Sequence, residues 1–312
     1  MANQLLLALE GGGTRSQAAL LDGAGNVLAT QDSLAVNTNF VPREQAERAV
    51  RLLVNGVLQA CGKNGQDIAH FVTSLVGVRF GAETFGGLCP AAKFHNYSEM
   101  RVVFARASIY RPHGVGLVAA TGATAWGLRN DDGREVMMGG WGSLLGDEGS
   151  AYAMGLMGLR AAVLAFEQRA PAPTGLVEAV CRHFNISADH FREELVPLVY
   201  QTPLGRTEIA GFAPLVSRLA DQGDALAKII TARVAADLAG LVLNAAGHLF
   251  SAGETFDVVM SGGLVNAGAL ILAPLQQQLV DAYPKVIFKT GSEAPAAALG
   301  RLLLYDLEEE AC

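Results

Sequence analysis

The chain has 312 residues, a formal net charge of −7 and 51% hydrophobic residues. This length exceeds what one hydrophobic core usually holds, so we expect two domains. The negative charge and the absence of a basic stripe disfavour nucleic-acid binding, and the best candidate for a membrane span, near residues 234–250, is interrupted by Asp237, Asn244 and His248.

The first residues, MANQLLLALEGGG, lack the basic region of a signal peptide and reach the charged Glu10 early. The cysteines form no Cys-x-x-Cys pair, which predicts reduced thiols without a disulfide or a zinc site. Together these features predict a cytoplasmic protein. The cysteines are Cys61, Cys89, Cys181 and Cys312.

Residues 4–35 read as three short apolar strands separated by glycine turns. The first turn, Glu10-Gly11-Gly12-Gly13-Thr14, would expose successive backbone N–H groups that can hold a phosphate. It is not a dinucleotide-binding fingerprint, because Ser16 occupies the third glycine position and a strand follows instead of a helix. A helix is then predicted over 43–61, a strand near 68–77, an irregular glycine-rich stretch, and a helix that begins near Ser98.

A second meander is predicted over residues 114–139, and it repeats the features of the first. A buried strand leads to the turn Thr121-Gly122-Ala123-Thr124. The spacing from Thr14 to the Asp22-Gly23 turn equals the spacing from Thr124 to the Asp132-Gly133 turn. Two units of strand, phosphate-binding turn and strand indicate a duplicated fold that holds a nucleotide from both sides.

The segment from Gly139 to Tyr152, GGWGSLLGDEGSAY, follows the second meander. Clustered glycines mark backbone that turns sharply or approaches a ligand closely. We expect Asp147 and Glu148 at the start of a helix running to about Arg169, where amides and carboxylates serve anion, metal or hydroxyl chemistry. The alternative is a glycine-rich loop capped by Asp147.

The remainder of the chain is predicted to be mostly helical over 175–250. A strand (256–261) then leads to Gly262-Gly263 and a helix. A last strand (286–289) and an Ala/Leu-rich helix (295–304) end the sequence. The predicted domain boundary lies near residues 112–114.

The chain resembles the N-acetylglucosamine kinases of the actin-like ATPase and sugar-kinase superfamily, which is related to the dehydratase-activator ATPases. The resemblance implies an α/β, duplicated ribonuclease-H-like (actin-like ATPase) fold with two lobes around a nucleotide cleft. The lobes would be residues 1–113 and residues 114–293 with a helical insertion, and a final helix (294–307) would pack back on the first lobe. The matching motifs, in order, are EGGGTRS (10–16), Asn37, Thr121-Gly122, GGWGSLLGDEGSAY (139–152) and SGGL (261–264).

The implied activity is ATP-dependent phosphorylation of N-acetylglucosamine, or a close amino sugar, on a hydroxyl. The cofactors would be ATP and Mg²⁺. The partner would be a small-molecule amino sugar, with no nucleic acid or membrane, and a homodimer is left open.

The resemblance also implies roles for individual residues. Glu10 would be the outer-shell Mg²⁺ carboxylate, because Mg²⁺ keeps several waters and needs few protein ligands. The alternative is a charged residue that ends a strand. Arg15 would assist phosphate or remain an exposed hairpin residue. The expected ATP-binding residues are Gly11, Gly12, Gly13, Thr14, Thr121, Gly122, Gly262 and Gly263.

For the sugar, the polar groups of Asn37 and Asp147 are the main candidates. Asn39 competes with Asn37, and either could cap the following helix. Trp141 would stack on the sugar or wall the N-acetyl pocket, or else be a core or hinge residue. Gly142 and Glu148 complete the expected sugar site, with locking of the loop as the alternative role of Glu148.

The sequence departs from the family pattern at two places. The family's general base is an Asp, whereas Glu99 stands near that position, so the expected catalytic residues are Glu99 and, as a fallback base, Asp147. The alternative for Glu99 is a first-turn helix residue that is favourable to the helix dipole. The second phosphate turn carries Ala120 and Ala123 in place of a glycine and a serine. These departures leave open a non-catalytic sugar sensor, and the superfamily leaves open an ATPase activator of a partner reductase.

Overall fold

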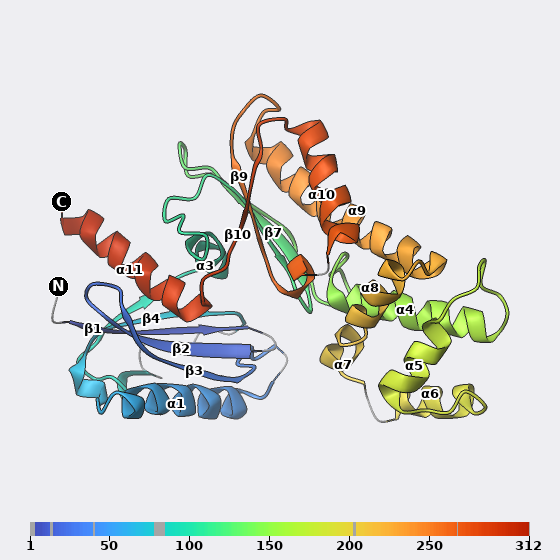
Figure 1. Cartoon of the computed structure of the whole chain (residues 1–312). Coiled ribbons are helices and arrows are strands. Elements are labelled where there is room, and N and C mark those ends of the chain that lie inside the picture. Colours follow the sequence, from blue (N-terminus) through green and yellow to red (C-terminus); the bar gives the residue numbers. More distant parts are fainter. Residues whose placement is uncertain are drawn as a thin grey trace. The chain divides into compact units, whose positions relative to one another are not determined.

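The computed structural model describes residues 4–12, 15–39, 41–77, 85–201, 204–266 and 268–311. It divides the chain into two compact units (Figure 1). The first unit comprises residues 1–112 and 290–312, and the second comprises residues 113–289. The chain therefore leaves the first unit after Pro112 and returns to it at Thr290.

The first unit is built on a five-stranded sheet of order β3-β2-β1-β4-β5. The predicted meander is confirmed, since β1, β2 and β3 pair antiparallel, whereas β4 runs parallel to both β1 and β5. The short edge strand β5 was not predicted from the sequence. The strands are β1 Leu5–Gly11, β2 Arg15–Asp22, β3 Val27–Leu34, β4 Ile68–Leu75 and β5 Lys93–Asn96.

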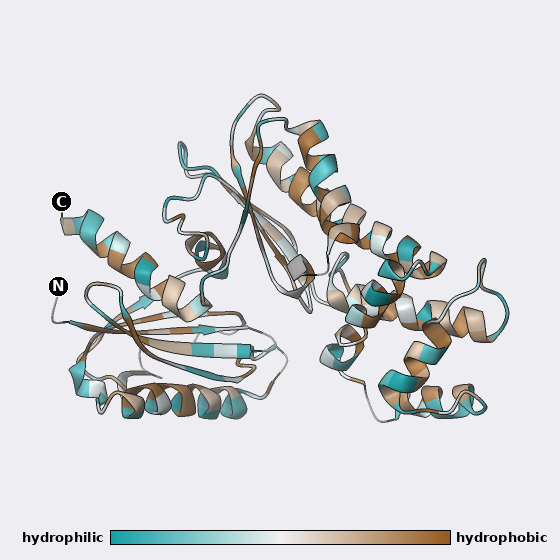
Figure 2. Ribbon diagram, in the orientation of Figure 1, coloured by the Kyte–Doolittle hydropathy of each residue, from teal (hydrophilic) through white to brown (hydrophobic). Residues whose placement is uncertain are grey.

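Helices cover both faces of this sheet, because successive residues of a strand point to opposite faces. Leu7 and Leu9 of β1 pack with Leu53 of α1 on one face. Leu6 of β1 packs with Leu299 of α11 on the other face. Figure 2 shows both hydrophilic and hydrophobic residues on α1, as expected for a helix with one face on a sheet. The helices are α1 Arg43–Ala60, α3 Glu99–Ala105 and α11 Pro295–Ala311, with a short 3₁₀ turn η1 Gly65–Asp67.

Polar contacts also hold α11 to the first unit. The hydroxyl of Tyr97 donates to Asp306 Oδ2 at 2.6 Å, and Arg101 Nη2 forms an ion pair with Asp306 Oδ1 at 3.2 Å. These contacts join α11 to α3 and to the segment that precedes it.

The second unit repeats the same sheet. Its strands are ordered β10-β9-β6-β7-β8, which is the order of the first sheet read from the other edge. The meander predicted for residues 114–139 is confirmed, with β6, β7 and β8 antiparallel and β9 parallel to β6. The strands are β6 Gly114–Ala119, β7 Ala123–Leu128, β8 Glu135–Gly139, β9 Asp257–Ser261 and β10 Ile287–Thr290.

The helices of the second unit share one hydrophobic core with the sheet. The longest is α9. Its N-cap residue is Asp224, whose side chain accepts a hydrogen bond from the N–H of Ala227. In the part of the chain that the structure describes, no helix is both long and apolar enough to cross a membrane. The helices are α4 Ala151–Phe166, α5 Leu176–Phe184, α6 Phe191–Tyr200, α7 Arg206–Ala210, α8 Ala213–Asp221, α9 Ala225–Leu249 and α10 Ala269–Ala282, with a 3₁₀ turn η2 Gly263–Asn266.

The start of α4 differs from the sequence prediction. The helix begins at Ala151, after the N-cap residue Ser150, and not at Asp147. Asp147 has φ 63° and Gly149 has φ 78°. Both values lie in the left-handed region, which a right-handed helix cannot contain. The residues 147–149 therefore form a turn that precedes the helix.

Candidate active site

Two carboxyl groups of the first unit are electrostatic neighbours. Glu10 is the last residue but one of strand β1, and Glu99 is the first residue of α3. The pKa of Glu10 is raised to about 8, mainly by burial and also by the charge of Glu99, while Arg106 acts in the opposite direction. Burial also raises the pKa of Glu99. The structure therefore brings together the predicted metal carboxylate and the predicted base.

Arg106 joins this pair, although no sequence motif singled it out. It follows the last residue of α3, and its Nε donates to the carbonyl of Glu293 at 2.7 Å. Burial lowers the pKa of Arg106, while Glu10 and Glu293 raise it. Residues seven apart on a helix share a face, so the spacing from Glu99 to Arg106 was a usable signal.

The first glycine turn closes a hairpin. The N–H of Gly12 donates to the carbonyl of Arg15 at 2.9 Å, and the carbonyl of Gly12 accepts from the N–H of Val36 at 3.3 Å. A Cβ atom on Gly11 would lie 2.2 Å from Val36. The N–H of Gly12 is thus used inside the hairpin and does not point outward as expected. Gly13 and Thr14, the other predicted phosphate ligands of this turn, lie outside the described residues.

Asn37 is buried next to the same hairpin. Its Oδ1 accepts from the N–H of Asn39 at 2.9 Å. A Cβ atom on Gly77, whose φ is 104°, would lie 2.4 Å from that oxygen. The alternative in which Asn37 or Asn39 caps α1 is wrong, because the N-cap residue is Pro42 and no side chain caps this helix.

In the second unit, Asp147 is the buried polar residue of the glycine-rich loop, with 2% of its surface exposed. Its Oδ1 accepts from the N–H of Ala123 at 3.2 Å, and its Oδ2 accepts from Nη2 of Arg206 in an ion pair. Asp147 therefore contacts the first residue of β7, directly after the Thr121-Gly122 turn. Arg206 was not among the predicted site residues, because nothing local in the sequence connects it to a loop so far from it along the chain.

The first N–H groups of α4 are all used within the protein. Those of Ala151 and Tyr152 donate to the carbonyls of Ala120 at 2.9 Å and Thr121 at 3.3 Å, and that of Ala153 donates to the hydroxyl of Ser150 at 3.0 Å. The expected anion-binding helix start is therefore wrong. These bonds instead fix the position of the Thr121-Gly122 turn against α4.

Trp141 lies on the surface of the glycine-rich loop and is 72% exposed. The alternative in which it is a core residue is therefore wrong. The next residue, Gly142, has φ 85°, and its carbonyl accepts from the N–H of Gly146 at 2.8 Å, so the backbone turns tightly beneath the ring. Glu148 is exposed, and its charge contributes to the raised pKa of Asp237, whose main cause is burial.

Gly262 and Gly263 follow β9, and they differ in their surroundings. Gly262 has φ 103°, and a Cβ atom there would lie 2.4 Å from the carbonyl oxygen of Ala119. A Cβ atom on Gly263 would meet nothing within 4 Å. Packing therefore requires glycine at Gly262, whereas the space beside Gly263 is open.

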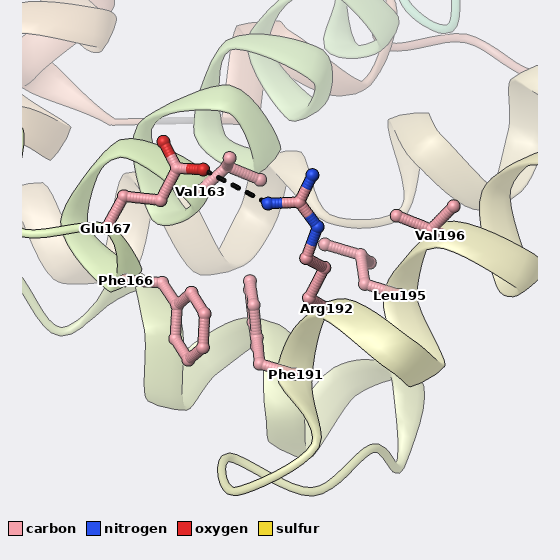
Figure 3. A pocket seen from close by; sticks show the side chains of 7 residues that line it. All are labelled: Val163, Phe166, Glu167, Phe191, Arg192, Leu195 and Val196. Atoms are coloured by element: carbon pink, nitrogen blue, oxygen red, sulfur yellow. Dashed lines mark ion pairs between the residues drawn. The ribbon is translucent and has the colours of Figure 1, made fainter.

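A pocket of about 150 Å³ lies between α4 and α6 (Figure 3). The rings of Phe166 and Phe191 stack at a centroid distance of 4.8 Å, and Arg192 Nη1 lies 3.6 Å from Glu167 Oε1 at the pocket. Its remaining lining residues are Val163, Leu195 and Val196. None of the predicted site residues lines it, so it is separate from the candidate active site.

The described residues contain no group of three or more His, Cys, Asp or Glu side chains that could hold a metal ion. Mg²⁺ does not require such a group, since it retains waters and binds one or two carboxylates together with phosphate oxygens. Glu10 and Glu99 fit this requirement, because burial disfavours the ionised form of both carboxyl groups and a nearby cation would favour it.

Two sheets of the same strand order, each with a small-residue turn after its first strand, define a duplicated ribonuclease-H-like fold of the actin-like ATPase class. The model of the BadF/BadG/BcrA/BcrD ATPase family matches residues 9–304, and the chain belongs to this family.

The chain is also similar to individual proteins in sequence and in structure. The chain is 24% identical to an N-acetylmuramic acid/N-acetylglucosamine kinase of Clostridium acetobutylicum over 90% of its length and 92% of the relative. It is 23% identical to an N-acetyl-D-glucosamine kinase of Dictyostelium discoideum, over 96% and 98% of the two chains. A solved structure from Chromobacterium violaceum, proposed to be an N-acetylglucosamine kinase, has a TM-score of 0.71 at 20% identity and covers 97% of this chain and 99% of its own. That likeness supports the fold.

Proposed function

We propose that the protein transfers the γ-phosphoryl group of ATP to a hydroxyl of N-acetylglucosamine or a close amino sugar. The observation that carries the proposal is the similarity, over at least nine-tenths of this chain, to two proteins named as amino-sugar kinases. The carboxyl groups of Glu10 and Glu99 supply the side chains that such a transfer needs.

In the proposed reaction the sugar hydroxyl oxygen attacks the γ-phosphorus, and the bond to the leaving ADP breaks. Glu99 accepts the hydroxyl proton. Burial raises the pKa of this carboxyl group, which makes its carboxylate a stronger proton acceptor. Glu10 would hold the waters of Mg²⁺, which when bound would offset the charge on the phosphates.

In the second unit, Asp147 and the exposed ring of Trp141 would bind the sugar, together with Gly142 and Glu148. Asp147 already accepts from Ala123 and Arg206, which favours a binding role for it over the role of fallback base. Asn37 is the candidate sugar-binding residue of the first unit. The candidate ATP-binding residues are Gly11 to Thr14 in the first unit and Thr121, Gly122, Gly262 and Gly263 in the second. A cytoplasmic location and the possibility of a homodimer belong to the same proposal.

The cysteines do not favour the alternative of an ATPase activator. Burial raises the pKa of the Cys89 thiol to about 11 and also raises that of Cys181. Iron–sulfur clusters are held by thiolates, so these two side chains are poorly suited to the task.

A coupled assay of ADP release with Mg·ATP tests the proposal. The panel comprises glucose, glucosamine, N-acetylglucosamine, N-acetylmannosamine and N-acetylmuramic acid. We expect turnover with one or two N-acetylated amino sugars. If none of these sugars causes ADP release but calorimetry still detects sugar binding, the protein would be a sugar sensor and not a kinase. Sugar-independent ATP hydrolysis without sugar binding would favour the activator.

A further inference from the structure

Three segments of the second unit meet at Asp147. They are the turn between β6 and β7, the glycine-rich loop and the start of α7. Asp147 Oδ1 accepts from the N–H of Ala123 at 3.2 Å, and Oδ2 accepts from Arg206 Nη2. The side chain of Asp147 is 2% exposed and that of Arg206 is 20% exposed.

Gly122 makes this meeting possible. A Cβ atom at position 122 would lie 2.4 Å from Arg206 Nη2 and 2.8 Å from Asp147 Oδ1. The guanidinium group of Arg206 and the carboxylate of Asp147 thus occupy the space that a side chain at position 122 would fill.

A buried carboxylate needs both a counter-charge and a fixed orientation to serve as a binding group. An ionised carboxylate offers about four acceptor positions, and the bonds to Ala123 and Arg206 occupy two of them. The two donors hold different oxygens, since Ala123 binds Oδ1 and Arg206 binds Oδ2, so together they fix the plane of the carboxylate. Arg206 therefore determines in which direction the remaining acceptor positions of Asp147 point.

We infer that Arg206 is the positioning residue that orients Asp147 to receive the hydroxyl groups of the sugar. The inference rests on the proposed function. It assigns sugar affinity, and not ATP affinity, to a residue of α7 that lies far from Asp147 in the sequence. Arg206 acts through Asp147 and takes no proton during the reaction.

The test compares Arg206→Ala and Arg206→Lys with the wild-type protein, and Arg182→Ala serves as the control. Arg182 is an arginine of the same unit that is 74% exposed and pairs with Glu178 on α5. For Arg206→Ala we expect the KM of the amino sugar to rise by about tenfold or more, because a mis-set hydrogen-bonding group penalises a hydroxylated ligand strongly. The KM of ATP should stay near the wild-type value. Arg206→Lys should recover part of the loss, and Arg182→Ala should leave both constants unchanged.

A double-mutant cycle with Asp147→Asn separates orientation from general destabilisation. If Arg206 acts through Asp147, the losses of sugar affinity in the single variants will not add in the double variant. Calorimetric titration of the sugar without ATP reads the same quantity when turnover is low, and a melting curve of each variant shows that it is folded.

Wild-type sugar KM in both Arg206 variants would overturn the inference while leaving the kinase intact. Additive losses in the cycle would do the same, and so would parallel increases in the KM values of sugar and ATP, which indicate a structural role. A wild-type protein that phosphorylates none of the amino sugars would instead overturn the proposed function. The inference would then be judged by sugar calorimetry alone, and an absence of sugar binding would overturn it as well.

Discussion

The carboxyl group of Glu99 raises the pKa of Glu10, although the two residues belong to a helix start and a strand end that are far apart in the sequence. Both groups are poorly hydrated, and the only opposing influence on Glu10 among the causes of its shift is Arg106. The two carboxyl groups should therefore affect both turnover and the free energy of unfolding, and each effect can be measured by itself.

Replacement of Glu99 should affect turnover. We expect Glu99→Gln to lower kcat by about 10²–10⁴-fold, the usual contribution of a general base, with little change in the KM values. Glu99→Asp should retain more activity than Glu99→Gln. Glu44→Gln is the matched control, because Glu44 is an exposed first-turn glutamate of α1 in the same unit. Wild-type kcat in Glu99→Gln would remove Glu99 from the reaction.

The pKa of Glu10 predicts a pH dependence of stability. Above pH 4.5 the unfolded chain releases the proton of Glu10, whereas the folded protein keeps it until about pH 8. The free energy of unfolding should therefore fall as pH rises from about 4.5 to 8, by on the order of a few kcal/mol. Glu10→Gln should flatten this decrease and stabilise the protein at pH 8. Melting curves between pH 5 and 8 measure the slope, and an unchanged slope in Glu10→Gln would contradict the assignment.

The exposure of Trp141 makes it a fluorescent reporter. The chain contains two tryptophans, and the other, Trp126, lies on β7. In a Trp126→Phe variant, whose only tryptophan is Trp141, we expect addition of the amino sugar to shift the emission to shorter wavelength, because the ring loses water on stacking. Trp141→Phe should show no such shift. An unresponsive Trp126→Phe variant that still binds sugar would place the sugar elsewhere.

The two glycines after β9 should respond differently to alanine. Gly262→Ala should lower the free energy of unfolding by about 1–3 kcal/mol or more, since it combines a left-handed φ with a clash against Ala119. Gly263→Ala, at open space, should leave the melting temperature close to that of the wild type. If adenosine lies against this backbone, Gly263→Ala will raise the KM of ATP without loss of stability. Equal destabilisation by both substitutions would contradict the geometry.

Much of the fold could be predicted from the sequence, because alternating apolar residues and glycine turns are local signals. Both meanders followed from them. The strand Lys93–Asn96 did not, since it is short and has only half-buried or exposed residues. The start of α4 was misplaced because bonds from its first N–H groups to Ala120 and Thr121 contribute to setting it.

The candidate site shows the same division. Glu10, Glu99 and Asp147 could be selected because they stand beside glycine turns or a helix start. Arg206 could not, since its role comes from a contact with Asp147 that only the folded chain creates. Arg106 was overlooked although its spacing from Glu99 was a usable signal.

The discontinuity of the first unit has a consequence for synthesis of the protein. Leu6, Ala8 and Leu21 of its sheet are covered by Leu299 and Leu303 of α11, which leaves the ribosome after residues 113–289. Until then one apolar face of the sheet lacks its partner helix, even though the strands were made first. The continuous segment 113–289 can acquire its own core earlier. The first unit is therefore completed only after the second unit has been translated.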